Sequence, residues 1–451
     1  MTEATERKRE PAKRFRRVKQ LRRRLDLDRS LGVYISVPFC RAKCTYCNFA
    51  SGVFGAEKMD AYVERVCAEM RGARGFAEGT GAKLPGVVDS IYLGGGTPSL
   101  LSAKQMRRLF VALRSEFAVN AEAEITLECA PGQLSDETLE EMLRQGMNRV
   151  SFGVQSFVDA EAKAVGRLHT REMCFGEIAR MRAVGVGNLN VDLIAGLPGQ
   201  TKTSWRESVN VALETGVPHV SVYMLEVDED SRLGREMLGA GDREQGTASR
   251  LRYGAGEVPA EDEIAEWYGE GCEWLGAAGV KQYEISNFAR EGFASRHNAK
   301  YWRREPYVGF GLDAHSMLRT TEGAVRWANT DGLDEYLEGR VEVQGLRLEG
   351  GAEGLVQLGA RIVTAPEIEV IGREKAFEEA MFLGLRMNDG VELEALRAEF
   401  GEGLVRGAVD AMGDVEEAGL VERDGGRVRL TAHGRMASNE VFGRLLVDTA
   451  V

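Results

Sequence analysis

The chain has 451 residues, of which 43% are hydrophobic and 28% charged. This is the composition of a globular protein long enough for two or three domains. It contains no run of 18 or more apolar residues, and its basic N-terminus lacks the apolar stretch of a secretory signal. We therefore expect a cytoplasmic protein without a transmembrane helix. In that compartment its seven cysteines indicate metal or redox chemistry rather than a disulfide framework.

Charge is distributed unevenly along the chain. Residues 1–30 carry 12 Lys and Arg against 5 Asp and Glu, although the whole chain has a net charge of −12. A basic N-terminal tail of this kind could contact an anionic membrane surface or nucleic acid. The favoured interpretation is a disordered or frayed helical arm that folds against the acidic body of the protein, with no nucleic-acid partner. Membrane contact by the tail stays open.

Short β-rich runs alternate with amphipathic helical stretches over residues 31–235. Such alternation produces successive βα units and therefore a parallel sheet. We expect an α/β fold, an incomplete (β/α)6 TIM-type barrel, with a doubly wound sheet as the alternative. Strands are predicted at residues 33–37, 90–94, 124–129, 149–154, 188–194 and 219–225, and helices near 58–72, 103–117, 135–145, 158–183 and 203–215.

The pattern changes after residue 235. Residues 236–259 include a Gly-rich polar stretch that predicts an inserted surface loop, and residues 260–345 form a linking region. Residues 346–451 predict a small α+β, winged-helix-like C-terminal domain. Its helices are expected near 374–386, 391–399 and 403–418, followed by a hairpin that turns at Gly425 and Gly426.

Small, polar and metal-binding residues follow the predicted strands. The first strand runs into three cysteines, the second into GGGTPS, the third into ECAPG, the fourth into VQSF and the fifth into AGLPGQ. The βα loops of α/β folds converge over the carboxyl ends of the strands, where active sites lie. This edge of the sheet is therefore the predicted functional site.

Three of the seven cysteines, Cys40, Cys44 and Cys47, lie within eight positions in a C-x3-C-x2-C pattern. A structural zinc site needs four closed ligands, and an iron–sulfur cluster is usually held by four thiolates. Three local thiolates would leave one iron of a cubane open to a small molecule. A zinc site completed by a distant residue is the alternative, and the nearest histidine in sequence is His169.

The cysteine pattern after the first strand, with Tyr46 just before its last cysteine, resembles the radical S-adenosylmethionine (SAM) superfamily. The resemblance implies a [4Fe–4S] cluster on the three cysteines, whose open iron is chelated by the amino and carboxylate groups of SAM. The glycine-rich segment GGGTP, residues 94–98, resembles the superfamily segment that binds the amino group of the cofactor. Glycines there allow backbone amides to approach a ligand that a Cβ would exclude.

Further motifs resemble one branch of the superfamily, the oxygen-independent coproporphyrinogen III oxidase-like proteins. These motifs are YISVPFC, RVSFGVQSF, GRLHT, NVDLIAGLPGQT, QYEISNFA and GLDAHS. The resemblance implies a cofactor-binding set made up of Tyr34, Gly95, Gly96, Thr97, Glu128, Gln155, Arg167 and Asp192. Carboxylates such as Glu128 and Asp192 can accept hydrogen bonds from an ammonium or a ribose, and a guanidinium can pair with a carboxylate.

Two members of this branch differ at informative positions. The oxidase, an enzyme of porphyrin biosynthesis, carries a further cysteine where this chain has Phe49. The haem chaperones of the branch carry an H-N-x-x-Y-W segment associated with haem binding. This chain has HNAKYW, which places His297, Tyr301 and Trp302 on that motif.

The resemblance therefore favours a haem chaperone that passes haem to an acceptor protein. Imidazole is a good axial ligand of haem iron, and aromatic side chains can stack on the macrocycle. His315 is a rival ligand. The alternatives are an anaerobic coproporphyrinogen III oxidase and a radical enzyme with an unrelated substrate, so enzyme activity is left open. An electron donor is required if the cluster is reduced.

Overall fold

The computed structural model describes residues 30–241, 252–339 and 367–445. Residues 1–29 of the predicted basic tail, residues 242–251 of the predicted inserted loop and residues 346–366 of the predicted C-terminal domain lie outside these ranges. Residues 236–241, predicted as part of the loop, instead belong to helix α9 (Arg232–Gly241). Within the described ranges, no helix combines the length and the apolarity that a membrane span requires.

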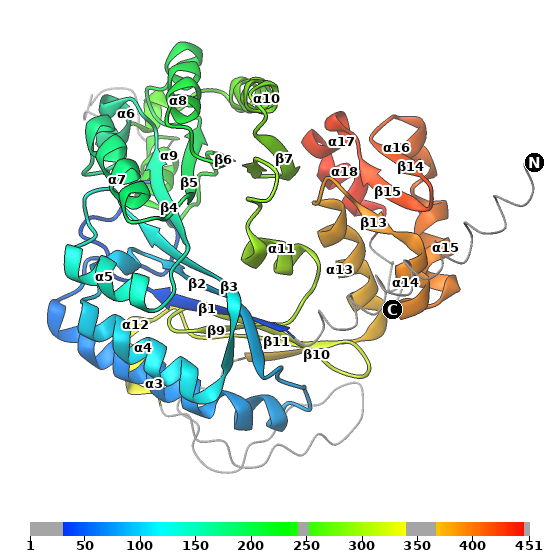
Figure 1. Cartoon of the computed structure of the whole chain (residues 1–451). Coiled ribbons are helices and arrows are strands. Elements are labelled where there is room, and N and C mark those ends of the chain that lie inside the picture. Colours follow the sequence, from blue (N-terminus) through cyan, green and yellow to red (C-terminus); the bar gives the residue numbers. More distant parts are fainter. Residues whose placement is uncertain (1–29, 242–251, 340–366, 446–451) are drawn as a thin grey trace, which may run out of the picture.

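Six parallel strands form the centre of the molecule and confirm the predicted α/β barrel architecture (Figure 1). They neighbour one another in chain order, and each overlaps one predicted strand. The strands are β1 (Ser30–Val37), β2 (Val87–Gly95), β3 (Ala118–Cys129), β4 (Arg149–Gln155), β5 (Asn188–Ala195) and β6 (His219–Met224).

Helices connect these strands as predicted, with one correction. The helix predicted at 158–183 is two helices, because the segment GRLHT interrupts it and the side chain of Thr170 caps the second one by accepting from the N–H of Met173. The connecting helices are α3 (Ala56–Gly79), the 3-10 turn η1 (Pro98–Leu100), α4 (Ala103–Glu116), α5 (Asp136–Arg144), α6 (Asp159–Ala164), α7 (Arg171–Ala183) and α8 (Lys202–Glu214).

The region after β6 adds strands to both edges of the same sheet. At one edge, β9 (Tyr307–Phe310) pairs in parallel with β1, and β10 (His315–Arg319), β11 (Ala324–Ala328) and β12 (Glu367–Ile371) continue antiparallel. At the other edge, β8 (Asn287–Ala289) pairs with β6, followed by β7 (Lys281–Glu284). The remaining elements of this region are α9 (Arg232–Gly241), η2 (Ala255–Glu257), α10 (Glu261–Ala277), α11 (Arg296–Trp302) and α12 (Leu333–Glu338).

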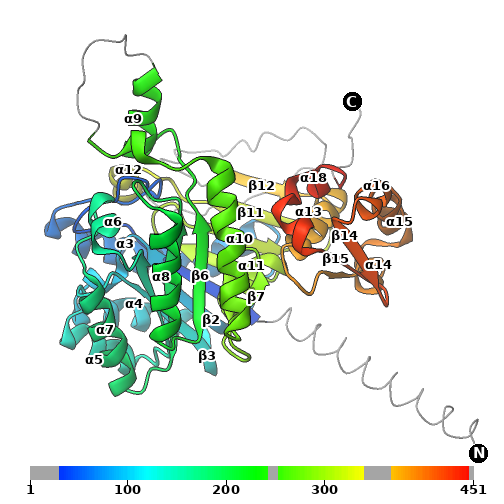
Figure 2. The same cartoon turned by 90° about the horizontal axis from the view of Figure 1, so that it is seen from above.

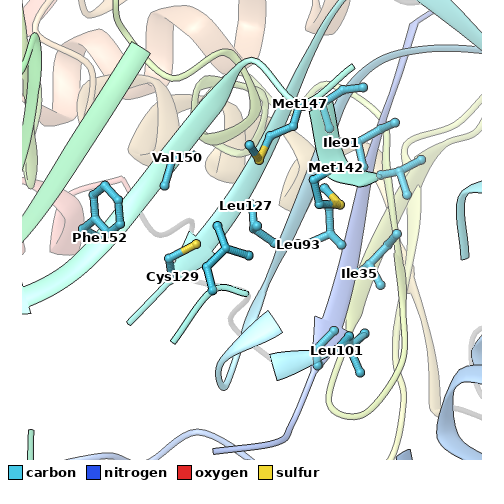
Figure 3. Packing of buried hydrophobic residues seen from close by; sticks show 14 of the residues in the cluster. Ile35, Ile91, Leu93, Leu101, Leu127, Cys129, Met142, Met147, Val150 and Phe152 are labelled. Carbon is cyan, nitrogen blue, oxygen red and sulfur yellow. The ribbon is translucent and has the colours of Figure 1, made fainter. Parts of the chain in front are cut away.

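Residue alternation gives the central sheet two different faces. The outer face carries apolar side chains that pack against α3, α4 and α5, and Figure 3 shows part of this core, with Ile35, Ile91, Leu93, Leu127 and Val150 among its labelled residues. Alternate positions on the same strands are polar, from Tyr34 on β1 to Asp192 on β5. Successive strand residues point to opposite faces. The barrel therefore presents a polar inner face opposite its apolar packing face.

The C-terminal domain combines helices with a small antiparallel sheet, as predicted, although the helix predicted near 403–418 is two helices that meet at Met412. Its hairpin turns at Gly425 and Gly426, both with positive φ (56° and 90°), as a two-residue type I′ turn requires. Its elements are α13 (Arg373–Leu385), β13 (Val391–Glu392), α14 (Leu393–Phe400), α15 (Glu402–Ala411), α16 (Gly413–Glu417), β14 (Val421–Asp424), β15 (Arg427–Leu430), α17 (Ala432–Met436) and α18 (Ser438–Gly443). Figure 2 shows this domain beside the barrel, and α13 contacts α11 of the barrel region.

A buried charge network joins the C-terminal domain to the barrel. Glu379 of α13 accepts from Arg326 of β11 at 2.6 Å and from Nε of Arg304 at 3.3 Å. The side chains of Arg304 and Glu379 are 3% and 5% exposed. Removing one member of a buried ion pair leaves an uncompensated charge in a poorly solvated position.

We expect Glu379→Gln to lower the free energy of unfolding by about 3 kcal/mol, because Arg304 would keep its charge and lose its buried counterion, retaining only the more exposed Glu399 at 4.0 Å. Glu140→Gln is the matched control, since Glu140 is 71% exposed in its pair with Arg144 and is expected to cost about 0.5 kcal/mol or less. Urea denaturation of both variants measures the difference. Equal losses would show that the network does not stabilise this interface.

Candidate functional site

The three clustered cysteines lie on the loop that follows β1, and all three are partly exposed. Backbone hydrogen bonds hold both ends of this loop: Cys40 N–H donates to the carbonyl of Gly52 at 2.9 Å, and Gly52 N–H donates to Pro38 at 2.9 Å. Thr45 N–H donates to Val165 at 3.2 Å, between α6 and α7. The cysteines are thereby fixed over the carboxyl ends of the strands, at the predicted edge.

Each cysteine sulfur has a polar neighbour. Thr97 donates its hydroxyl to Sγ of Cys40 at 3.7 Å, and Arg167 donates from Nη1 to Sγ of Cys44 at 3.5 Å. Sγ of Cys47 lies 3.7 Å from the hydroxyl of Ser51. The hydroxyl of Thr97 and the guanidinium of Arg167 can donate hydrogen bonds to thiolates, the form of cysteine that binds a metal. Burial raises the pKa of the Cys40 thiol.

The histidine nearest to the cysteines in sequence, His169, is not placed as a fourth zinc ligand. Nε2 of His169 instead lies 3.0 Å from the carbonyl of Val154, and burial, aided by the charge of Arg167, lowers the pKa of this histidine to about 4. A structural zinc site needs four convergent ligands, and His169 does not complete one.

The glycine-rich segment lies directly against the cysteine loop. Gly96 N–H donates to the carbonyl of Val37 at 2.9 Å, and Thr97 N–H donates to Phe39 at 2.8 Å. A Cβ on Gly96 would lie 2.8 Å from the carbonyl oxygen of Val37 and close to two further backbone atoms. Only glycine allows this approach of the β2 end to the β1 end.

Two carboxylates lie on the inner face just below this edge. Glu128 of β3 accepts from the hydroxyl of Tyr92 at 2.7 Å, and burial, with the nearby charge of Asp192, raises the pKa of Glu128 to about 7. Asp192 of β5 accepts from Asn190 at 2.7 Å, and burial raises its pKa. Both side chains can accept hydrogen bonds from a bound amine or hydroxyl.

Gln155 and Arg167 meet at the end of β4. Gln155 has a φ of 69°, in a region uncommon for residues other than glycine, at an irregularity in the β4–β5 pairing. Arg167 Nη2 donates to the carbonyl of Gly153 while its Nη1 contacts Cys44. The guanidinium therefore lies between the cysteine loop and the end of β4. Residues with unusual backbone angles, such as Gln155, cluster at ligand sites.

The predicted tyrosines border this region on two sides. Tyr34 of β1 stacks on Tyr92, with ring centroids 6.1 Å apart. Tyr46 packs against a small apolar cluster that contains Val165 and Ile194. Phe49, two residues beyond Cys47, is 61% exposed.

The HNAKYW segment forms α11, which lies on the inner side of the barrel (Figure 1). His297 is 1% exposed, with Nδ1 3.0 Å from the hydroxyl of Ser90 and Nε2 2.8 Å from the hydroxyl of Tyr301. Its ring centroid lies 5.3 Å from that of Tyr92 and 6.5 Å from that of Tyr34. Burial, with a contribution from Lys300, lowers the pKa of His297 to about 3. The structure thus brings the segment against the predicted cofactor residues.

The remaining haem candidates lie in different surroundings. Trp302 is covered by the guanidinium of Arg386, 4.7 Å from its ring centroid, and its Nε1 is buried without a hydrogen-bond partner among the described residues. The side chain of His315, at the start of β10, is 59% exposed, and its Nε2 lies 3.8 Å from a carboxylate oxygen of Asp313. Trp302 therefore contacts the C-terminal domain, whereas His315 lies at the surface.

Sequence reasoning missed much of the inner face. Inward-facing polar residues recur on β2 to β6, and a period of two is visible in IYLG, EITLE, RVSFG, NLNVD and HVSVY. That alternation could have identified a polar interior. These residues are Ser90, Tyr92, Glu124, Thr126, Arg149, Ser151, Asn190, His219 and Ser221.

Comparison with known proteins defines the class of protein to which this chain belongs. The family model of the radical SAM superfamily matches residues 34–212, and that of the HemN C-terminal domain matches residues 372–437. The solved structure of coproporphyrinogen III oxidase (HemN) from Escherichia coli has a TM-score of 0.74 and 21% identity, covering 94% of this chain and 91% of that chain. This chain is therefore a radical SAM protein. Its domain implies a [4Fe–4S] cluster and SAM.

Sequence relatives identify the family within this class of proteins. The heme chaperone HemW of Lactococcus lactis is 31% identical over 422 residues, 94% of this chain and 99% of that protein. HemW of Bacillus subtilis is 32% identical over 414 residues, 92% and 98% of the two chains. Within the coproporphyrinogen III oxidase-like branch, the chain belongs to the HemW family.

The raised pKa of Glu128 predicts a pH-dependent stability. The folded protein holds this proton up to about pH 7, whereas the ordinary value is 4.5, so the free energy of unfolding falls as pH rises through this interval. Glu128→Gln removes the titration. We expect the variant to gain stability relative to the wild type between pH 5 and pH 8, on the order of 2 kcal/mol. Thermal denaturation of both proteins at pH 5 and at pH 8 measures this gain. An equal difference in stability between variant and wild type at the two pH values would contradict it.

Proposed function

We propose that this protein is a haem chaperone that binds a [4Fe–4S] cluster, SAM and haem, and passes the haem to an acceptor protein. The observation that carries the proposal is that the α11 segment contacts the inner face of the barrel next to the proposed cofactor residues. The α11 segment lies within ring-contact distance of the inner-face tyrosines, just below the carboxylates and cysteines of the cofactor edge.

The cysteine loop fits the cluster. Cys40, Cys44 and Cys47 would be its three ligands, on one loop held by backbone hydrogen bonds. The hydroxyl of Thr97 and the guanidinium of Arg167 would remain as hydrogen-bond donors to the sulfur atoms. Such donors tune the potential of an iron–sulfur centre.

The neighbouring residues fit SAM. Gly95, Gly96 and Thr97 bring backbone against the cysteine loop without a side chain in the way, as the cofactor amino group requires. Arg167 would pair with the cofactor carboxylate. The proposed set also includes Tyr34, Tyr46, Gln155, Glu128 and Asp192, which lie on the cysteine loop or on strands β1, β3, β4 and β5.

The α11 segment would hold haem through His297, Tyr301 and Trp302. Nε2 of His297 faces the hydroxyl of Tyr301 in this structure, so axial ligation requires that the phenol move away from the ring nitrogen. Burial keeps the imidazole neutral, which is the form that ligates iron. The exposed His315 is the alternative ligand, and it needs no such rearrangement.

The cluster assignment predicts unequal effects of two Cys→Ser changes. Cys44→Ser should abolish the broad visible absorbance of anaerobically reconstituted protein and lower its iron content, because it removes a cluster ligand. Cys174→Ser should leave both unchanged, since Cys174 is buried on α7. Equal losses would mean that the wrong thiols have been assigned.

The chaperone and oxidase functions are separated by one anaerobic experiment. Reconstituted protein is assayed side by side for haem uptake and for conversion of coproporphyrinogen III in the presence of a reductant and SAM. We expect a Soret band that shifts in His297→Ala and no decarboxylated product, because Phe49 stands where the oxidase has its further cysteine. Formation of protoporphyrinogen would favour the oxidase.

A further inference from the structure

Three neighbouring strands carry a row of buried polar atoms without hydrogen-bond partners. Thr126 of β3 pairs in register with Arg149 of β4, and Arg149 pairs with Asn188 of β5. The three atoms Oγ1 of Thr126, Nε of Arg149 and Oδ1 of Asn188 have no partner among the described residues. Buried polar groups without partners are rare in folded proteins, and each costs free energy.

This row belongs to the inner face of the barrel. Arg149 and Ser151 occupy alternate positions of β4, and Ser151 donates to Asp192 across the inner face. Thr126 likewise alternates with Glu128. The row lies four residues before Gly153 on β4, about 13 Å deeper than the cofactor edge. It is therefore separate from Arg167, the residue proposed for the SAM carboxylate.

Arg149 is only 1% exposed, and its charge lowers the pKa of both Glu128 and Asp192 against the effect of burial, but these carboxylates accept their hydrogen bonds from other residues. Glu128 accepts from Tyr92, and Asp192 accepts from Asn190 and Ser151. Glu124 accepts from the backbone N–H groups at the start of α11. A buried guanidinium is stable only when an anion is paired with it.

We propose that Arg149, with Thr126 and Asn188, binds a propionate carboxylate of the haem that enters the barrel. The proposal deepens the chaperone function and rests on it. The guanidinium fork and the threonine hydroxyl can both donate to one carboxylate. A third contact would come from the NH2 group of Asn188, because its unpartnered Oδ1 is an acceptor like the carboxylate. A singly charged carboxylate suits this position better than a phosphate dianion, because Glu128 and Asp192 lie in the next layer of the same face.

The position of α11 supports this ligand. Glu124, one inward-facing position before Thr126 on β3, accepts from His297 N–H at 3.0 Å. The row therefore lies beside the segment proposed to bind the haem iron. A propionate reaching Arg149 would anchor the edge of a macrocycle whose face contacts α11.

The test compares haem with its dimethyl ester, in which both propionates are blocked. Each is titrated into the full-length protein and followed by its Soret band. The wild type should bind haem at least about tenfold more tightly than the ester, the gain expected of a charge-assisted hydrogen bond. Arg149→Gln should lose that preference while binding the ester as the wild type does.

Two controls keep the result interpretable. Arg114→Gln removes a surface arginine of α4 and should leave both affinities unchanged. Arg149→Gln should retain the cluster absorbance, which reports an intact cofactor edge. If this variant fails to fold, Thr126→Val, which removes another proposed donor, is titrated in its place and should weaken the binding of haem but not of the ester.

The outcomes separate this inference from the function on which it rests. Equal affinity of the wild type for haem and the ester would overturn the propionate site and leave the chaperone function standing. Equal loss of both ligands in Arg149→Gln would also overturn it, because the arginine would then be purely structural. A wild type that binds no haem would defeat the proposed function itself.

Discussion

The arrangement of the candidate site depends on one close backbone contact, between the ends of β1 and β2. Gly96 and Thr97 donate their N–H groups to carbonyls of Val37 and Phe39, immediately before the first clustered cysteine. The contact requires a residue without Cβ at position 96. Because of it, the cysteine loop and the glycine-rich segment act as one rigid edge. The polar residues of β3, β4 and β5 are placed relative to that edge by the parallel register of the sheet.

Alternate residues along the strands of this sheet have different roles, in the hydrophobic core and on the polar inner face. Its outer positions, such as Ile35 and Leu93, build the core with the surrounding helices. Its inner positions carry hydroxyls, carboxylates, amides and a buried arginine. Rings of α11 close one side of this polar interior, and Arg386 links Trp302 to the C-terminal domain. A ligand held on α11 would therefore affect the contact between barrel and C-terminal domain.

Local pattern predicted most of the barrel and the cofactor edge. The six strands follow from β-rich runs, and the cysteine loop follows from a spacing that no other part of the chain has. The split between α6 and α7 was missed although its local signals are present in GRLHT, where Gly166 ends α6 with a φ of 85° and Thr170 caps α7. The contacts of Arg167 with Cys44 and Gly153, in contrast, cannot be read from local sequence.

The inner face of the barrel was harder to predict because its contacts join residues that are far apart in the sequence. Burial of His297 depends on Ser90, 207 positions earlier in the chain, and the row around Arg149 exists only through strand register. The added strands β9 to β12 are short, and they join the sheet beyond β1, through β9, only in the folded protein. Periodicity reports which side of a strand a residue occupies, but not what lies opposite.

The central claim is that three thiolates on one loop hold a cubane whose remaining iron is open to SAM. Chemical analysis of anaerobically reconstituted full-length protein, with and without SAM, tests it most directly. The account predicts about four iron atoms and four labile sulfides per chain, with a spectrum of the reduced cluster that changes when SAM is added. Stoichiometric zinc without iron or sulfide would contradict it.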